Sequence, residues 1–213
     1  MTQADDRRRY YNAIAGGSRD RLAAISDGIF AVSMTLLVLG LAVPHAVDFV
    51  TESDALSALA NLAPNIVTYF MSFLTLGIFW VGQQTQLSQV ERTDRDYTWI
   101  MLAFLLFVTL VPFSTAFLAA FYHSRVALLE YWVNIAVLGL CLLGGAEYAG
   151  RRGLFRDTAA VLPAIRRRIY TAQLMYLVAA LLCAVDTRLS IGVIVLIQLN
   201  YAIAPPLRFL RRL

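Results

Sequence analysis

Few residues of this sequence have the types and spacing that catalysis or metal binding requires. The two histidines, His45 and His123, lie at the ends of apolar runs and have neither HxxxH nor HExxH spacing, so a zinc site has little support. Glu130 and Glu147 lie near opposite ends of one apolar run, too far apart on one helix to act as a carboxylate pair. We therefore expect no enzyme and no cofactor.

The polar residues Ser26 and Asp27 are more informative, because they stand near the start of an apolar run from Ile25 to Pro44. A charge at mid-depth in a bilayer costs roughly 2.5–3.5 kcal/mol or more, so it lies near an interface or finds a partner. One interpretation makes both residues first-turn caps of a helix. The other is a buried polar network between two helices, built from Arg21, Ser26, Asp27, Trp80, Gln83 and Gln84, in which Arg21 supplies the counter-charge.

An apolar stripe follows these polar residues. Val32, Leu36 and Leu39 recur at i, i+4 and i+7, with Thr35 beside them, which places them on one face of a helix. Such a stripe is ordinarily a packing surface. If identical helices surrounded an axis, however, the three side chains would form stacked apolar rings, which can gate a pore by dewetting.

The elements that carry these residues are membrane helices. Of 213 residues, 59% are hydrophobic and 15% charged, and the mean hydropathy is +0.65, too apolar for a soluble domain. Six runs approach the ~20 residues that a spanning helix needs: Ile25–Pro44, Leu56–Val81, Trp99–Tyr122, Val126–Tyr148, Ile169–Val185 and Leu189–Phe209. We expect an all-α membrane protein with an N-terminal segment over 1–24, a six-helix domain over 25–209 and a tail over 210–213.

The basic residues predict the orientation of these helices. All 18 are arginine, and 16 of them fall on one side of the predicted membrane, against Arg125 and Arg188 on the other. By the positive-inside rule both termini are cytoplasmic in a multi-pass protein of the cell membrane. The arginines are explained by topology and anionic lipid headgroups, so we expect the lipid bilayer as a partner and no nucleic acid.

The first run resembles a known family, the bacterial relatives of the lysosomal potassium channel transmembrane protein 175. The family's hallmark is an arginine, three residues, Phe-Ser-Asp-Gly, and a Phe-Ala-rich helix that ends in Thr-Leu-Leu-Val-Leu. This chain reads Arg21, three residues, then "ISDGIFA" from Ile25 and "TLLVL" from Thr35. "SFLTLGIFWVGQQ" from Ser72 and "LVPFSTAFLAAF" from Leu110 are similar to the family's second and third spans, so the resemblance covers roughly the first 120 residues.

The resemblance implies a homotetramer of six-span subunits that passively conducts monovalent cations, with potassium as the expected ion and no other metal. It implies that the first helices line the pore and that no TVGYG filter is needed. Val32, Leu36 and Leu39 would be the constrictions and Thr35 a hydroxyl layer. Three acids of the first outer loop, Asp48, Glu52 and Asp54, would attract cations, or belong to an ordinary solvated loop.

Three departures from the family pattern bear on these expectations. Ile25 replaces the motif phenylalanine, Val32 is smaller than the usual Ile or Leu, and Gln83 and Gln84 stand where the family commonly has a histidine pair. Two other functions stay open at this point. One is a secondary transporter, coupled to protons through Asp27, and the other is a non-conducting membrane scaffold or enzyme subunit.

Overall fold

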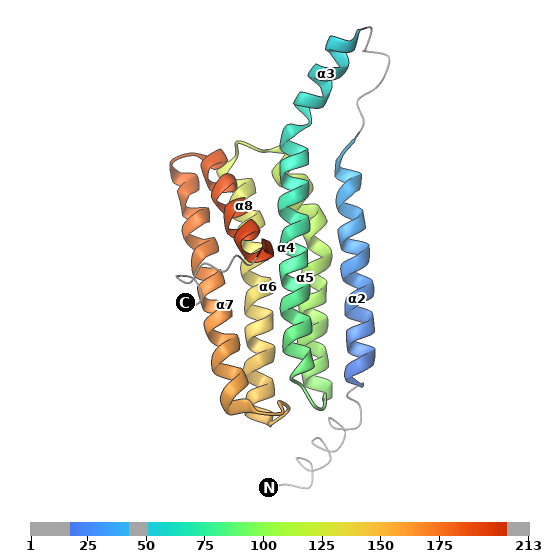
Figure 1. Ribbon diagram of the computed structural model, residues 1–213, viewed down its shortest axis with the longest axis vertical. Coiled ribbons are helices and arrows are strands. Elements are labelled where there is room, and N and C mark those ends of the chain that lie inside the picture. Colours follow the sequence, from blue (N-terminus) through green and yellow to red (C-terminus); the bar gives the residue numbers. More distant parts are fainter. Residues whose placement is uncertain (1–17, 43–50, 204–213) are drawn as a thin grey trace.

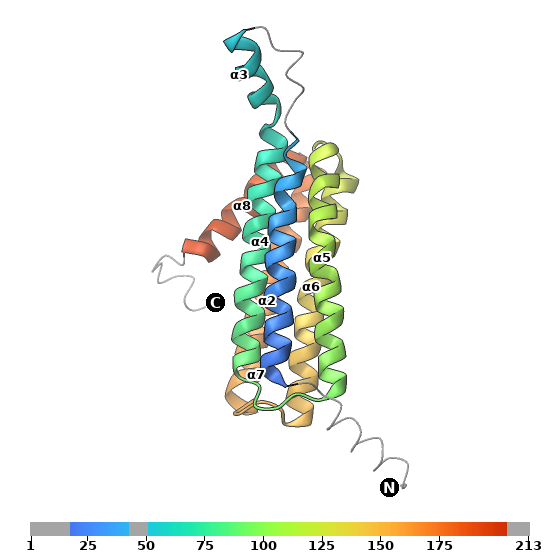
Figure 2. The same ribbon diagram turned by 90° about the vertical axis from the view of Figure 1, so that its right-hand side faces the viewer.

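The computed structural model describes residues 18–42 and 51–203, and within these ranges the chain is helical apart from its turns and one isolated bridge. Five long helices lie side by side, while α8 is shorter and leaves the bundle at an angle (Figures 1 and 2). The helices are α2 (Arg19–Leu36), continued by η1 (Leu37–Gly40), α3 (Glu52–Asn61), α4 (Ala63–Ser88), α5 (Arg95–Ala120), α6 (Arg125–Arg152), α7 (Thr158–Leu181), continued by η3 (Leu182–Ala184), and α8 (Thr187–Ile203).

Four of the six predicted runs form helices that are long and apolar enough to cross a membrane. These are α2 with η1, α4, α5 and α6, which have 22, 26, 26 and 28 residues. The fifth run covers the second half of the 24-residue α7 and continues through η3 to Val185. The sixth begins in α8, which has 17 described residues. The last six residues of the predicted sixth run, with the predicted tail over 210–213, lie outside the described ranges.

The boundaries predicted for the second and fifth runs are wrong. The run from Leu56 is broken at Leu62: α3 is a separate helix without a buried residue, and α4 begins with Pro64 in its first turn, where proline loses no hydrogen bond. α4 then continues past Val81 to Ser88. α7 begins at Thr158, eleven residues before the predicted Ile169. Hydropathy misses the last turns of α4 and the first turns of α7, because polar and charged residues form helices as readily as apolar ones.

The arginines gather at the two ends of the bundle unequally. The start of α2, the α4–α5 connection and the α6–α7 connection share the lower end in Figure 1. Between them they carry Arg19, Arg21, Arg92, Arg95, Arg151, Arg152 and Arg156. The upper end, where α5 meets α6 and α7 meets α8, has Arg125 and Arg188 among the described residues. The alternation of charge along the sequence therefore becomes a separation of charge in space.

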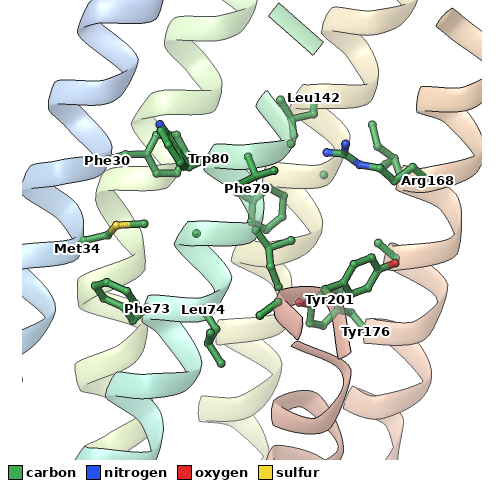
Figure 3. Close-up of a pocket in the computed structure, with 18 of the residues that line it drawn as sticks. Phe30, Met34, Phe73, Leu74, Phe79, Trp80, Leu142, Arg168, Tyr176 and Tyr201 are labelled. Atoms are coloured by element: carbon green, nitrogen blue, oxygen red, sulfur yellow. The ribbon is translucent and has the colours of Figure 1, made fainter. Parts of the chain in front are cut away.

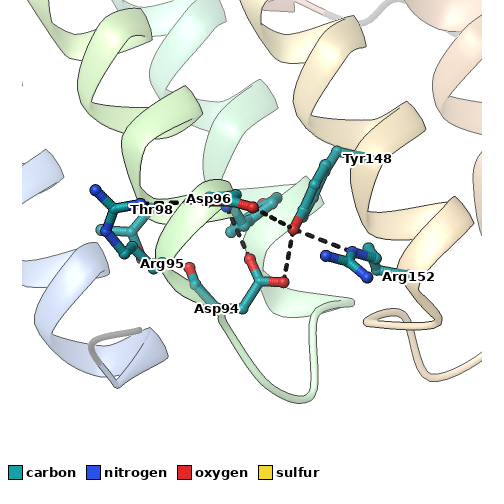
Figure 4. A network of polar contacts seen from close by, with 7 residues as sticks. Asp94, Arg95, Asp96, Thr98, Tyr148 and Arg152 are labelled. Atoms are coloured by element: carbon teal, nitrogen blue, oxygen red, sulfur yellow. Dashed lines mark hydrogen bonds and ion pairs between the residues drawn. The ribbon is translucent and has the colours of Figure 1, made fainter. Parts of the chain in front are cut away.

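Polar contacts fasten α5 to α6 at the arginine-rich end (Figure 4). Asp94 is the N-cap of α5, and its Oδ1 accepts from the backbone N–H of Tyr97 at 2.8 Å. The Tyr148 hydroxyl of α6 contacts the other oxygen of Asp94 at 2.8 Å and Asp96 Oδ2 at 3.3 Å. Arg152 Nε donates to the same hydroxyl at 3.2 Å. These contacts fix the arginine-rich end of the bundle without using α2.

The core between α4, α5, α6 and α8 contains a polar layer within an otherwise apolar interior. The buried Tyr131 hydroxyl bonds Ser72 Oγ at 3.1 Å and Thr75 Oγ1 at 2.9 Å. Thr115 Oγ1 donates to Ser72 Oγ at 2.6 Å, and Gln198 Nε2 donates to Thr75 Oγ1 at 2.6 Å. Because buried polar groups are costly unless bonded, this layer fixes how α8 sits against α4.

Candidate functional site

α2 is a helix with one face against its own bundle and the other uncovered. Its buried residues Leu22, Ser26, Phe30 and Ser33 recur every three or four positions and face α4 and α5. On the other face, Val32, Leu36 and Leu39 are 57%, 43% and 74% exposed. Large apolar side chains exposed in a row mark a binding or assembly surface.

The predicted stripe keeps its alignment because α2 tightens near its end. From Leu37 to Gly40 the backbone is a 3₁₀ helix, in which side chains three residues apart eclipse one another. Leu39 therefore stands closely above Leu36 instead of drifting around the axis. The Thr35 hydroxyl, also exposed, donates to the carbonyl of Val32 at 2.8 Å. Its lone pairs stay available on the uncovered face.

The polar residues of α2 are joined to α4 by three hydrogen bonds, which we call the α2–α4 joint (Ser26, Asp27, Trp80, Gln83 and Gln84). Asp27 Oδ1 accepts from Trp80 Nε1 at 2.8 Å and from Gln84 Nε2 at 2.6 Å. Ser26 Oγ accepts from Gln83 Nε2 at 2.9 Å. Ser26 and Gln83 are buried. The joint fixes the rotation of α2, so that its apolar stripe points away from α4.

Arg21 is the one predicted network residue that the structure does not bring to the joint. Within the described residues it forms no ion pair with Asp27; its backbone N–H donates to Ser18 Oγ, the N-cap of α2, at 3.2 Å. The reason is geometric: six residues at 100° each turn the helix through 600°, which puts the two side chains on different faces.

Asp27 is also not a first-turn residue. α2 begins at Arg19 with Ser18 as its N-cap and Asp20 in its first turn, so the interpretation of Ser26 and Asp27 as caps is wrong. The sequence alone placed the start of the helix at Ile25, where hydropathy rises. The charged turn before that point is helical as well, which leaves Asp27 more than two turns inside the helix.

Two further features lie at the opposite end of α2. Asn65 Nδ2 of α4 donates to the carbonyl of Gly40 at 3.1 Å, a contact that sequence reasoning missed because the two residues lie in different helices. Of the three outer acids, Asp48 lies outside the described residues. Glu52 and Asp54 form the first turn of α3, where Asp54 Oδ2 accepts from the backbone N–H of Thr51 at 3.0 Å.

The described residues contain no group of three or more histidine, cysteine, aspartate or glutamate side chains that could hold a metal ion. The chemistry of the site is therefore that of an apolar helix face, a hydroxyl and the hydrogen-bonded joint behind them. No side chain in this arrangement is placed as a nucleophile beside a general base.

Comparison with known proteins gives this arrangement a family context. A family model described as the endosomal/lysosomal potassium channel TMEM175 matches residues 21–112. A potassium channel of Chamaesiphon minutus is 32% identical over 189 residues, which cover 86% of this chain and 93% of that protein. A potassium channel of Streptomyces collinus is 33% identical over 150 residues, or 68% of this chain and 71% of that protein.

The fold agrees with these sequence matches. The crystal structure of a lysosomal potassium-selective channel TMEM175 homolog from Chamaesiphon minutus superposes with a TM-score of 0.74 at 29% identity, covering 87% of this chain and 97% of that one. The matched residues include α2 and α4, which form the joint and the uncovered stripe. The chain is thus a multi-pass membrane protein that belongs to the TMEM175 family.

Proposed function

We propose that this chain is the subunit of a passive cation channel, a homotetramer in which four copies of α2 surround the pore. The observation that carries the proposal is the uncovered apolar face of α2, with Val32, Leu36 and Leu39 exposed in a row. A helix that turns bulky apolar residues away from its own bundle needs another protein or lipid surface to cover them. Relatives named as potassium channels support a channel as the purpose of that surface.

In this proposal Val32, Leu36 and Leu39 form three apolar rings around the axis. Rings of this kind exclude water, and so block ions, when the pore is narrow. Water and ions can pass when the pore widens. Thr35 adds a hydroxyl between the first two rings, and its free lone pairs face the ion path. Potassium is the expected ion, and the channel needs no TVGYG filter.

The α2–α4 joint has a mechanical role in this proposal. Trp80 and Gln84 hold the carboxylate of Asp27, and Gln83 holds Ser26. Since α4 packs against the rest of the subunit, the joint transmits the position of the bundle to the rotation of α2. Arg21 takes no part in the joint and lies exposed in the first turn of α2, at the arginine-rich end of the bundle.

We further propose that α7 and α8 complete six spans and that both termini are cytoplasmic, in the cell membrane. The gathering of arginines at the end where α2 begins supports this orientation through the positive-inside rule. α7 is 24 residues long and lies beside α6, which is length enough to span.

The test is ion flux through vesicles that contain the purified protein. We expect passive potassium flux in the wild type. Leu36→Asn should raise the basal flux several-fold, because asparagine side chains from the four subunits would bind water in the constriction. The matched control is Leu140→Asn, at an exposed position of α6, which should leave flux unchanged. Equal flux in all three proteins would show that Leu36 does not face the pore.

Two further measurements distinguish the channel from its rivals. Native mass measurement should give a complex of four copies, and a monomer in a mild membrane mimic would remove the shared pore. Slow, saturable uptake that is strictly coupled to protons would instead favour a secondary transporter.

A further inference from the structure

A large cavity opens behind α2, on the side away from the apolar stripe. Its volume is about 780 Å³, and residues of α2, α4, α6, α7 and α8 line it (Figure 3). The wall is almost entirely apolar and includes Phe30, Met34, Phe73, Leu74 and Ile169. A volume of this size accommodates an acyl chain, because ligand cavities for molecules of several hundred daltons measure about 300–1,000 Å³.

One cationic side chain points into this apolar space. Arg168 projects from α7 toward α4 and lines the cavity (Figure 3). Within the described residues no carboxylate pairs with its guanidinium, whereas Arg166, two positions earlier, forms a bidentate ion pair with Glu147. Asp27 also lines the cavity, but its Oδ1 is held by Trp80 and Gln84. Arg168 is partly open to its surroundings, so its guanidinium can reach an anion that enters the cavity.

The backbone of α4 makes room for this guanidinium. Gly82 is buried in α4, and a Cβ at that position would lie 2.3 Å from Arg168 Nη2. A side chain at this position would force the Arg168 guanidinium to shift from where it lies. A glycine inside a helix is less stable than an alanine, and here the missing side chain leaves room for the arginine.

The depth of Arg168 suits a lipid headgroup. α4 has 26 residues, or about 39 Å at 1.5 Å per residue, and the hydrocarbon core is about 30 Å thick. Gly82, six residues before the end of α4, therefore lies close to the arginine-rich edge of the hydrocarbon. Arginine binds phosphate with two parallel hydrogen bonds, and phosphates of lipids lie just outside this depth.

We propose that this cavity binds an anionic phospholipid of the cytoplasmic leaflet, whose phosphate pairs with Arg168 and whose acyl chain fills the space between α4 and α7. The proposal goes beyond ion conduction and does not depend on it; only the choice of leaflet rests on the orientation proposed above. Because Phe30 and Met34 of α2 form one wall of the cavity, the bound chain also supports α2 from behind.

The test measures lipid retained by the purified protein, after reconstitution into bilayers of equal phosphatidylglycerol and phosphatidylcholine and gentle extraction. We expect phosphatidylglycerol to be retained preferentially by the wild type. Arg168→Gln should lower that retention at least fivefold, while Arg167→Gln, which removes an adjacent exposed arginine outside the cavity, should leave it unchanged.

A second pair of variants tests the acyl-chain site while Arg168 is intact. Gly77 lines the cavity and has open space where a side chain would begin, so Gly77→Leu should fill the cavity and also lower retention. Gly144→Leu is the matched control, an equally open helical glycine of α6 outside the cavity. Equal retention of the two lipids by the wild type, or unchanged retention in Arg168→Gln and Gly77→Leu, would overturn the proposal. The latter result is expected if a neighbouring subunit fills the cavity.

Discussion

The free energy that couples Asp27 to its partner Trp80 can be measured by replacing the two residues separately and together. Asp27→Ala removes the acceptor of the 2.8 Å bond, and Trp80→Phe removes the donor while keeping an aromatic ring. The free energies of unfolding of the wild type, both single variants and the double variant form a cycle. Its coupling term reports the Asp27–Trp80 contact apart from the loss of the Gln84 bond, which Asp27→Ala also causes.

The structure sets the size of this coupling. A hydrogen bond to a charged group contributes roughly 1.5–3 kcal/mol when it is buried. Asp27 is exposed in the single chain, which lowers the value, and such cycles in membrane proteins average about 0.6 with a maximum near 1.7 kcal/mol. We therefore expect a coupling of about 1 kcal/mol between Asp27 and Trp80.

The matched cycle pairs Asp27→Ala with Arg21→Ala. Because Arg21 lies on a different face of α2, we expect its coupling to Asp27 to stay below about 0.3 kcal/mol, within the error of additivity. All the free energies of unfolding come from equilibrium unfolding by sodium dodecyl sulfate in mixed micelles. Helix content is monitored by circular dichroism, a signal that does not rely on Trp80. A coupling for Arg21 that equals or exceeds that for Trp80 would refute the assignment of the joint.

Three further outcomes follow from the described contacts. Tyr131→Phe should lower the free energy of unfolding by about 1–2 kcal/mol, because it leaves buried hydroxyls without their shared partner, whereas Tyr170→Phe, at a position 59% exposed, should change it little in the same unfolding assay. Gly153→Ala should destabilise by about 1 kcal/mol, since Gly153 ends α6 at φ 60°, a conformation that costs other residues roughly 1–2 kcal/mol. Gly144→Ala, at an open position inside α6, should instead stabilise by about 0.5–1 kcal/mol, and equal melting temperatures for these two alanine variants would contradict both arguments.

The sequence was sufficient to locate the apolar runs, the separation of arginines and the motif of the first span. These are local properties: whether a segment suits lipid depends on its own composition, and charges report the side of the membrane on which each connection lies. For the same reason the family was recognisable from "ISDGIFA" and "TLLVL". The all-helical fold and the family membership agree with that prediction, and four of the six predicted spans form helices long and apolar enough to cross a membrane.

The ends of the helices were harder to predict from the sequence. Hydropathy falls where a helix enters headgroups or water, although the helix itself continues. α2 and α7 both begin in charged turns, at Arg19 and Thr158, and α4 begins at a proline that hydropathy ignores. The error at α2 mattered most, since it made Asp27 resemble a cap.

The tertiary structure decided which side chains meet. Ser26 and Asp27 were known from the sequence to need partners, yet the choice between Arg21 and the polar residues of α4 depends on how α2 is rotated about its axis. That rotation is set by the packing of Phe30 and Ser33 against neighbouring helices together with the hydrogen bonds of the joint, which no local pattern encodes. The same packing leaves Arg168 facing an apolar cavity behind α2, where its sequence neighbours suggested only one more arginine at the membrane surface.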